Sequence, residues 1–153
     1  MTYEELLTAA EQNNLIVQER TMNGHDGLIK GRHVAIRKNI ETSKEKACVL
    51  AEELGHHCTS SGNIIDMQDV MSRKQEHRAR VWTYNKQIGL LGLIRAFEHG
   101  CRNLWEVADY LDVPDDFLED ALICYKQKYG TFTVVDQYVI YFIPALNIGK
   151  MLR

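Results

Sequence analysis

Ala51-Glu52-Glu53-Leu54-Gly55-His56-His57 is the stretch of this 153-residue sequence that decides its fold. It lies in an alanine- and leucine-rich segment that opens with the capping pattern Thr42-x-x-Glu45, so we expect one helix from there to about Cys58. Apolar residues recur in it at helical spacing, and we expect these to face the core: Ala47, Leu50, Ala51, Leu54 and Cys58. The remaining arc carries two carboxylates and two imidazoles, which is typical of a helix that lines a cleft.

The polar residues follow the spacing of the metal-binding motif H-E-x-x-H, with Glu52 in place of the first histidine. Positions i and i+4 project from the same side of a helix, so Glu52 and His56 can bind one metal ion. Glu53 then lies beside the metal's water as a candidate general base. His57 is about 100° further around the helix from His56, and we assign it to the cleft, to the second shell of the site or to the surface. The alternative is a solvated helix face on which Glu52 and His56 form a surface pair.

A catalytic zinc site usually has three protein ligands and one open position, so a third ligand is needed. We choose Glu76, which begins a second helix far enough along the chain to fold back antiparallel to the first. The alternative for Glu76 is an ion pair with Arg80 at i+4 on a solvated face. Asp66 and Asp69 are competing ligands from the preceding loop.

Composition places the chain among ordinary globular proteins, with 45% hydrophobic and 25% charged residues. A net charge of −3 gives no global field that would attract nucleic acid or an anionic membrane. The N-terminus is acidic and no apolar run reaches the length of a membrane span, so we expect a cytoplasmic protein without a membrane partner. The four cysteines have no C-x-x-C spacing, and we expect buried free thiols.

The remaining sequence predicts an α+β fold that is mostly helical, with a small antiparallel sheet. Helices are expected at 2–13, 74–87, 88–100, 103–113 and 114–130. Strands are expected at 15–17, in a hairpin within 27–40, and as two short strands within 131–146, whereas 59–73 is expected to be irregular. We divide the chain into a metal-site core, 1–87, and a C-terminal helical subdomain with terminal strands, 88–153, packed as one unit.

The run from Glu45 to His57, followed by Lys74-Gln75-Glu76-x-x-Ala79, resembles the ImmA/IrrE family of metallo-endopeptidases. The closest likeness is to members from phages and other mobile elements, in which an E-E-L-G-H form of the motif is familiar. The resemblance extends over nearly the whole chain, with support from Tyr3-Glu4-Glu5-Leu6-Leu7 and from the Gly27-Leu28 hairpin. It implies a zincin-like core in residues 1–87 and cleavage of the element's own helix-turn-helix repressor, which induces the element's genes.

Carried onto this sequence, the resemblance makes Glu52, His56 and Glu76 the metal ligands and Glu53 the general base. Zinc lowers the pKa of a bound water toward ~7, and Glu53 would accept the proton that this water releases. Two carboxylates and one imidazole are harder ligands than two imidazoles, so we expect weaker selectivity for zinc and tolerance of manganese. Two anionic ligands also weaken the metal's Lewis acidity, and we therefore expect a slow, substrate-specific protease.

A second hypothesis comes from residues 103–113 followed by Phe117, which resemble the first helix and turn of a helix-turn-helix. The chain would then be a non-enzymatic transcriptional regulator or a repressor-binding protein. Direct binding to DNA is disfavoured by the start of the would-be recognition helix, which has four acidic residues and no basic one: Asp115, Asp116, Glu119 and Asp120. An acidic face is better suited to a basic protein partner, and a simply solvated face is the alternative.

Overall fold

The computed structural model describes residues 1–60 and 69–152, with the backbone alone for 69–72. The fold is mixed α+β, as the sequence predicted. The chain divides into two compact units, Met1–Lys86 and Gln87–Arg153. In the described part of the chain, every helix is too short or too polar to cross a membrane.

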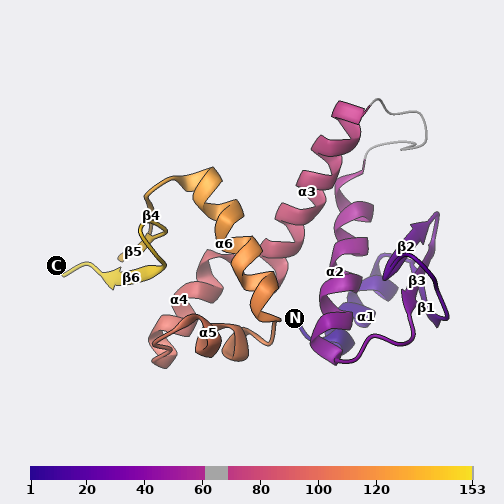
Figure 1. The fold of residues 1–153 in the computed structure, drawn as a ribbon, viewed down its shortest axis with the longest axis horizontal. Helices are drawn as coiled ribbons and strands as arrows, with labels where there is room; N and C mark the ends of the chain where they lie inside the picture. Colours follow the sequence, from indigo (N-terminus) through magenta and orange to yellow (C-terminus); the bar gives the residue numbers. More distant parts are fainter. Residues whose placement is uncertain (61–68, 153) are drawn as a thin grey trace. The chain divides into compact units, whose positions relative to one another are not determined.

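The N-terminal unit consists of three helices and a three-stranded sheet (Figure 1). Its elements in chain order are α1 (Tyr3–Gln12), β1 (Ile16–Arg20), β2 (Gly27–Lys30), β3 (His33–Arg37), α2 (Ser43–Thr59) and α3 (Asp69–Gln87). The predicted hairpin is confirmed, since β2 and β3 pair antiparallel. The sheet as a whole is mixed, because β1 pairs with β3 in parallel and the strand order is β1-β3-β2. The expectation of a purely antiparallel sheet was therefore wrong for this unit.

Burial explains why β3 occupies the centre of that sheet. Val34 and Ile36 alternate with less buried neighbours along β3, and both are fully buried against the helices. β1 and β2 contribute mostly exposed side chains and take the two edges. The shared core of α1, β3 and α2 consists of Leu6, Ala10, Leu15, Val34, Ile36, Ile40, Ala47, Leu50, Ala51 and Leu54. Alternation along a strand identifies its buried face but not its pairing partner, so the parallel pairing could not be read from the sequence.

Helix α2 begins where the capping pattern predicted, because the Thr42 side chain accepts a hydrogen bond from the Glu45 amide at 3.2 Å. An ion pair of 2.6 Å between Lys46 and Glu19 joins this helix to β1. The last turn of α2 extends beyond the core, so Cys58 is exposed and the prediction that it faces the core was wrong. All four cysteines are free, but only Cys124 is buried.

Helix α3 begins at Asp69, earlier than expected, so the prediction of irregular structure up to residue 73 was wrong for 69–73; residues 61–68 lie outside the described part. It packs against α2 at Gly55, where a Cβ atom would lie 2.7 Å from the carbonyl oxygen of Ala79. The Thr83 hydroxyl lies between the two helices, 2.8 Å from the carbonyl oxygen of Ala79 and 3.3 Å from that of Ala51. The missing side chain of Gly55 therefore permits the close approach of α3 to α2.

The C-terminal unit contains three helices followed by an antiparallel three-stranded sheet of order β4-β5-β6. Its elements are α4 (Gly89–His99), α5 (Leu104–Leu111), α6 (Asp115–Tyr129), β4 (Phe132–Val135), β5 (Tyr138–Tyr141) and β6 (Asn147–Lys150). Tyr125 is fully buried at the centre of this unit, and its hydroxyl accepts a hydrogen bond from the Gly89 amide. The sequence predicted only two of the three strands, because β6 contains a glycine and a single large apolar residue, Ile148, and so shows no alternation.

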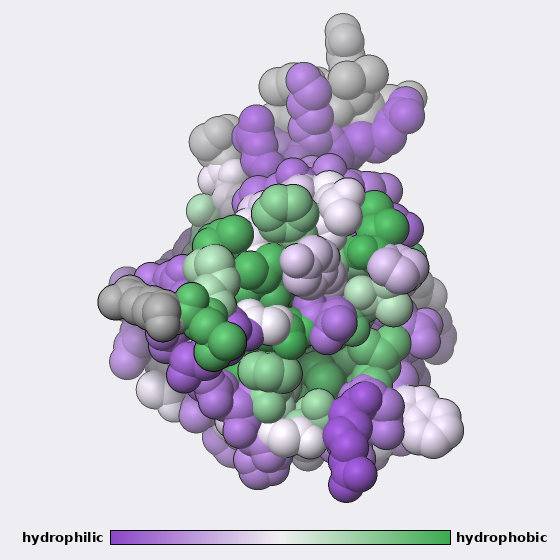
Figure 2. Space-filling model, turned by 90° about the vertical axis from the view of Figure 1, so that its left-hand side faces the viewer, coloured by the Kyte–Doolittle hydropathy of each residue, from purple (hydrophilic) through white to green (hydrophobic). Residues whose placement is uncertain are grey.

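Apolar side chains also reach the surface of the C-terminal unit. Figure 2 shows many of them gathered on one face of the molecule. The exposed large apolar residues of this unit include Leu91, Trp105, Ile123, Phe132, Val134 and Tyr141. Phe132 and Tyr141 are cross-strand neighbours with ring centroids 5.8 Å apart, which stabilises the pairing of β4 with β5.

Candidate metal centre

The candidate metal centre begins with two side chains on α2. Glu52 and His56 are one helical turn apart, and both are half-buried. The core residues Leu50, Ala51 and Leu54 fix the rotation of the helix, so the arc that carries Glu52 and His56 is turned away from the core. The spacing of the sequence motif is thus converted into a fixed pair of potential ligands.

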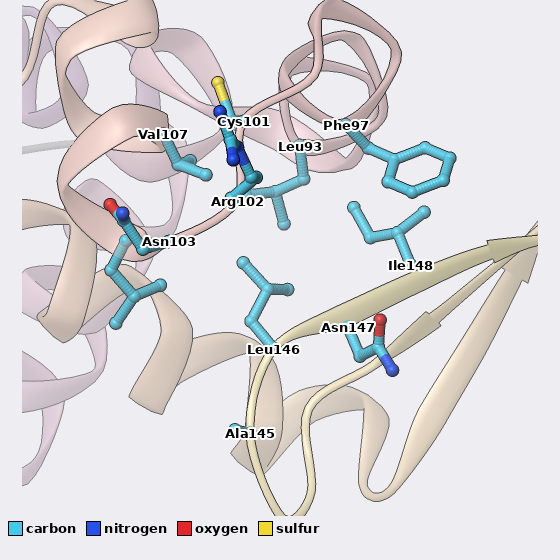
Figure 3. Close-up of a pocket in the computed structure, with 11 residues that line it drawn as sticks. Leu93, Phe97, Cys101, Arg102, Asn103, Val107, Ala145, Leu146, Asn147 and Ile148 are labelled. Atoms are coloured by element: carbon cyan, nitrogen blue, oxygen red, sulfur yellow. The ribbon is translucent and has the colours of Figure 1, made fainter.

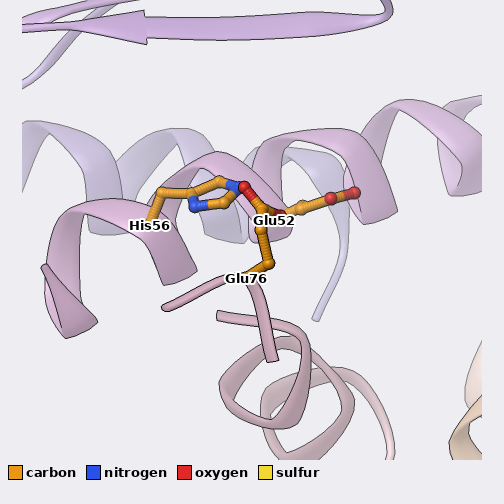
Figure 4. A group of neighbouring side chains, drawn as sticks. All are labelled: Glu52, His56 and Glu76. Carbon is orange, nitrogen blue, oxygen red and sulfur yellow. The ribbon is translucent and has the colours of Figure 1, made fainter. Parts of the chain in front are cut away.

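The third side chain comes from α3. The Oε2 atom of Glu76 lies 3.6 Å from Nε2 of His56, and Figure 4 shows the two side chains approaching each other from neighbouring helices. Glu52, His56 and Glu76 each offer one ligand atom, and these atoms all lie within 4.8 Å of one another. The group is therefore close enough to bind a metal ion.

The group is reachable from solvent. The side chain of His56 is 17% exposed, whereas that of Glu76 is 49% exposed. A centre that is closed on the side of α2 and open on the side of Glu76 can admit a further ligand or a substrate. A catalytic metal site needs such an open position, in contrast to a structural site whose ligands close around the ion.

Glu53 lies on the same helix but is buried, with only 8% of its surface exposed. It packs against the edge strand β2, where a Cβ atom on Gly27 would lie 2.9 Å from Oε1 of Glu53. Burial, followed by the negative charges of Glu52 and Glu76, raises the pKa of Glu53 from 4.5 to about 7. A carboxyl group with this pKa can both accept and release a proton near neutral pH.

The donor set fits a divalent ion of intermediate hardness. Two carboxylate oxygens and one imidazole nitrogen are ligands for zinc and for manganese, and the pair of carboxylates offsets the ion's charge. In the absence of an ion, three acidic side chains, Glu52, Glu53 and Glu76, repel one another across a partly buried site. A bound cation would relieve this repulsion.

The structure brings together all three predicted ligands, whereas the other candidates are not part of the group. His57 is exposed at the end of α2 and does not belong to the cluster. Asp66 lies outside the described residues, as does the side chain of Asp69. The alternative ion pair of Glu76 with Arg80 is not among those formed within the described part of the chain.

Sequence reasoning missed Gly27 as part of this site. From the sequence, Gly27 is only part of the Gly27-Leu28 hairpin that supports the resemblance. Its contact with Glu53 joins residues that are far apart in the chain, and a side chain at position 27 would meet both Glu53 and Val49. No local sequence pattern predicts which strand packs on which helix, so the contact between Gly27 and Glu53 can be found only in the folded structure.

A separate cavity of about 260 Å³ lies in the C-terminal unit, between α4, α5 and the segment that leads into β6. Figure 3 shows Leu93, Leu146 and Ile148 converging on it. Its wall also includes Phe97 and Val107 with a few polar residues at its edge. This cavity was not predicted from the sequence, because its lining comes from three separate segments.

No protein-family model and no curated protein matches this chain. Its functional assignment consequently depends on the geometry and chemistry of the site itself.

Proposed function

We propose that this chain is a metal-dependent endopeptidase with a zincin-like core, in which Glu52, His56 and Glu76 hold a zinc or manganese ion. The observation that carries the proposal is the convergence of three potential ligands from two helices, with a buried carboxyl group next to one of them in the helix. A solvated pair of charges would need neither the third residue nor the burial of Glu53.

Each residue has a definite part in the proposed reaction. When bound, the metal ion supplies Lewis acidity toward a water molecule and a peptide carbonyl. Glu53 accepts the proton of the attacking water on its carboxylate and can pass it to the leaving amine. Gly27 keeps Glu53 oriented and partly shielded from solvent, which holds its pKa in the range that this exchange requires.

The ligand set makes the proposed enzyme slow. Glu52 and Glu76 place two negative charges on the ion, which reduces its attraction for electrons of a substrate carbonyl. Slow turnover would suffice for a switch that destroys one repressor molecule at a time. We therefore propose a helix-turn-helix repressor of a phage or mobile element as the substrate, which is what the resemblance of the motif implies.

A DNA-binding regulator is the less favoured function. The first turns of α6, which would be the recognition helix, expose all four of their acidic residues, Asp115, Asp116, Glu119 and Asp120. These carboxylates would meet the phosphates of DNA. The same carboxylates could contact a basic protein. A repressor substrate fits this requirement, because its DNA-binding surface is basic.

The test incubates this chain with any helix-turn-helix repressor that its neighbouring genes encode and follows cleavage on a gel with zinc, with manganese and with a chelator. We expect slow cleavage that the chelator stops and that Glu53→Gln abolishes while metal binding persists. Glu45→Gln, an exposed change on the same helix, is the matched control and should cleave normally. Cleavage that survives both the chelator and Glu53→Gln would refute the proposed mechanism.

A further inference from the structure

Helix α3 carries many positively charged side chains from Arg73 onward, and none of them belongs to the metal site. From Arg73 to Gln87 the helix has five basic residues and one acidic residue, Glu76, in a chain whose net charge is −3. The basic residues are Arg73, Lys74, Arg78, Arg80 and Lys86. Arg73, Lys74, His77 and Arg78 are all exposed and together line a shallow hollow, which we call the basic face.

The basic face points away from the packing between α2 and α3. Gln75, Ala79 and Thr83 are buried and recur every four residues, which defines the side of α3 that contacts α2. At 3.6 residues per turn, the basic face lies on the opposite side of the helix. Its cations therefore do not act as ligands or counter-ions inside the metal site, although they share a helix with Glu76.

The charges of the basic face are not neutralised within the part of the chain that the structure describes. None of the ion pairs among described residues includes Lys74 or Arg78. These two residues are four apart on one helix, where like charges repel each other. Lys86 differs, because it lies over the Trp82 ring at 5.4 Å. The repulsion left among the described residues is relieved when an anionic partner binds.

The dimensions of the basic face favour a short acidic peptide over a nucleic acid. Residues 73–78 rise by ~7.5 Å along the helix, at ~1.5 Å per residue. An extended peptide covers that length with about two or three residues. Specific contact with duplex DNA buries a much larger surface than this face offers, and the chain's net charge of −3 provides no wider positive field to hold the phosphates.

We propose that the basic face of α3 is an exosite that binds an acidic segment of the protein substrate, outside the metal centre. This inference rests on the proposed function for the identity of the partner, but the binding itself needs neither the metal nor catalysis. Because Glu76 is on the same helix, a substrate held at the exosite is kept at a high effective concentration near the metal centre. The DNA-binding surface of a repressor is basic, so the recognised segment lies elsewhere in the substrate.

The test measures fluorescence anisotropy of a labelled ten-residue peptide rich in Asp and Glu, with full-length Glu53→Gln protein in a chelator. A basic peptide of equal length and a labelled DNA duplex are measured in parallel. Lys74→Gln/Arg78→Gln removes two charges from the basic face. Lys30→Gln/Lys38→Gln removes two exposed charges from the same unit at positions outside it and is the matched control.

We expect the acidic peptide to bind, with a Kd that rises about tenfold in Lys74→Gln/Arg78→Gln and by less than about twofold in the control. Added salt should weaken the binding, since the charges are exposed. Equal losses in the two double variants, no binding by the starting protein, or tighter binding of the duplex than of the peptide would each overturn the exosite. Since metal and activity are absent from this assay, a failed cleavage test leaves its result unaffected.

Discussion

Replacing Glu53 by glutamine should make the metal-free protein more stable at alkaline pH, because the native side chain is buried as an acid. Its pKa is raised from 4.5 to about 7 in the folded state, mainly by burial and then by Glu52 and Glu76. The folded protein therefore holds this proton more tightly than the unfolded chain does. The resulting stability is present below pH 4.5 and is lost as the pH rises through about 7.

The size of the effect follows from the same values. A rise from 4.5 to about 7 corresponds to an upper limit of about 3–4 kcal/mol, at ~1.4 kcal/mol for each pH unit. Glu53 retains some contact with solvent, so we expect about 2 kcal/mol. Most of this difference should develop between about pH 5 and pH 8, because the unfolded chain is ionised there whereas the folded state keeps its proton until the pH passes about 7. Glutamine has a similar shape and no charge, so Glu53→Gln should not show this loss.

The assay is urea unfolding of both proteins in a chelator, at several pH values across that interval. The free energy of unfolding of Glu53→Gln, relative to that of the starting protein, should grow by about 2 kcal/mol from pH 5 to pH 8. Glu45→Gln, exposed on the same helix, should show no such trend. Parallel pH profiles for Glu53→Gln and the starting protein would refute the claim that burial disfavours the charged form of Glu53.

Three further substitutions test the packing around the site. Gly55→Ala should destabilise by about 1–3 kcal/mol in urea unfolding, because its Cβ would lie 2.7 Å from the Ala79 carbonyl oxygen; Gly92→Ala, which meets only a Leu111 side-chain atom at 3.3 Å, should cost less. Equal costs would contradict the close helix contact. Gly27→Ala should reduce cleavage because the added Cβ displaces Glu53, whereas metal binding measured by calorimetry should be unchanged. Loss of metal binding would contradict the claim that Gly27 acts on Glu53 alone. Thr42→Ala should cost about 1 kcal/mol through loss of the cap to Glu45, and no change would argue against that cap.

The sequence predicted the parts of the fold that depend on local patterns. The capping pattern at Thr42 located the start of α2, and the i, i+4 spacing placed Glu52 and His56 on one side of it. The hairpin of β2 and β3 followed from alternating residues such as Val34 and Ile36. In each case the information is contained in a few neighbouring residues.

Features that depend on contacts between distant segments were missed or left open. The parallel pairing of β1 with β3 and the third strand of the C-terminal sheet were not predicted. Glu76 could be chosen from sequence only against the alternative of a solvated pair with Arg80, since the angle of α3 decides which partner it reaches. The burial of Glu53 under Gly27 depends on how a strand packs on a helix. Cys58 was misplaced because helical periodicity does not reveal where the core ends.

The central claim is that Glu52, His56 and Glu76 hold one metal ion, and isothermal titration of the chelator-treated protein with zinc and with manganese tests it most directly. We predict one ion per chain, with at least about tenfold weaker binding in each of Glu52→Gln, His56→Ala and Glu76→Gln. Glu45→Gln and His33→Gln, which change exposed residues outside the cluster, should bind as the starting protein does. The absence of stoichiometric binding, or equal affinity in Glu76→Gln and its control, would contradict the claim.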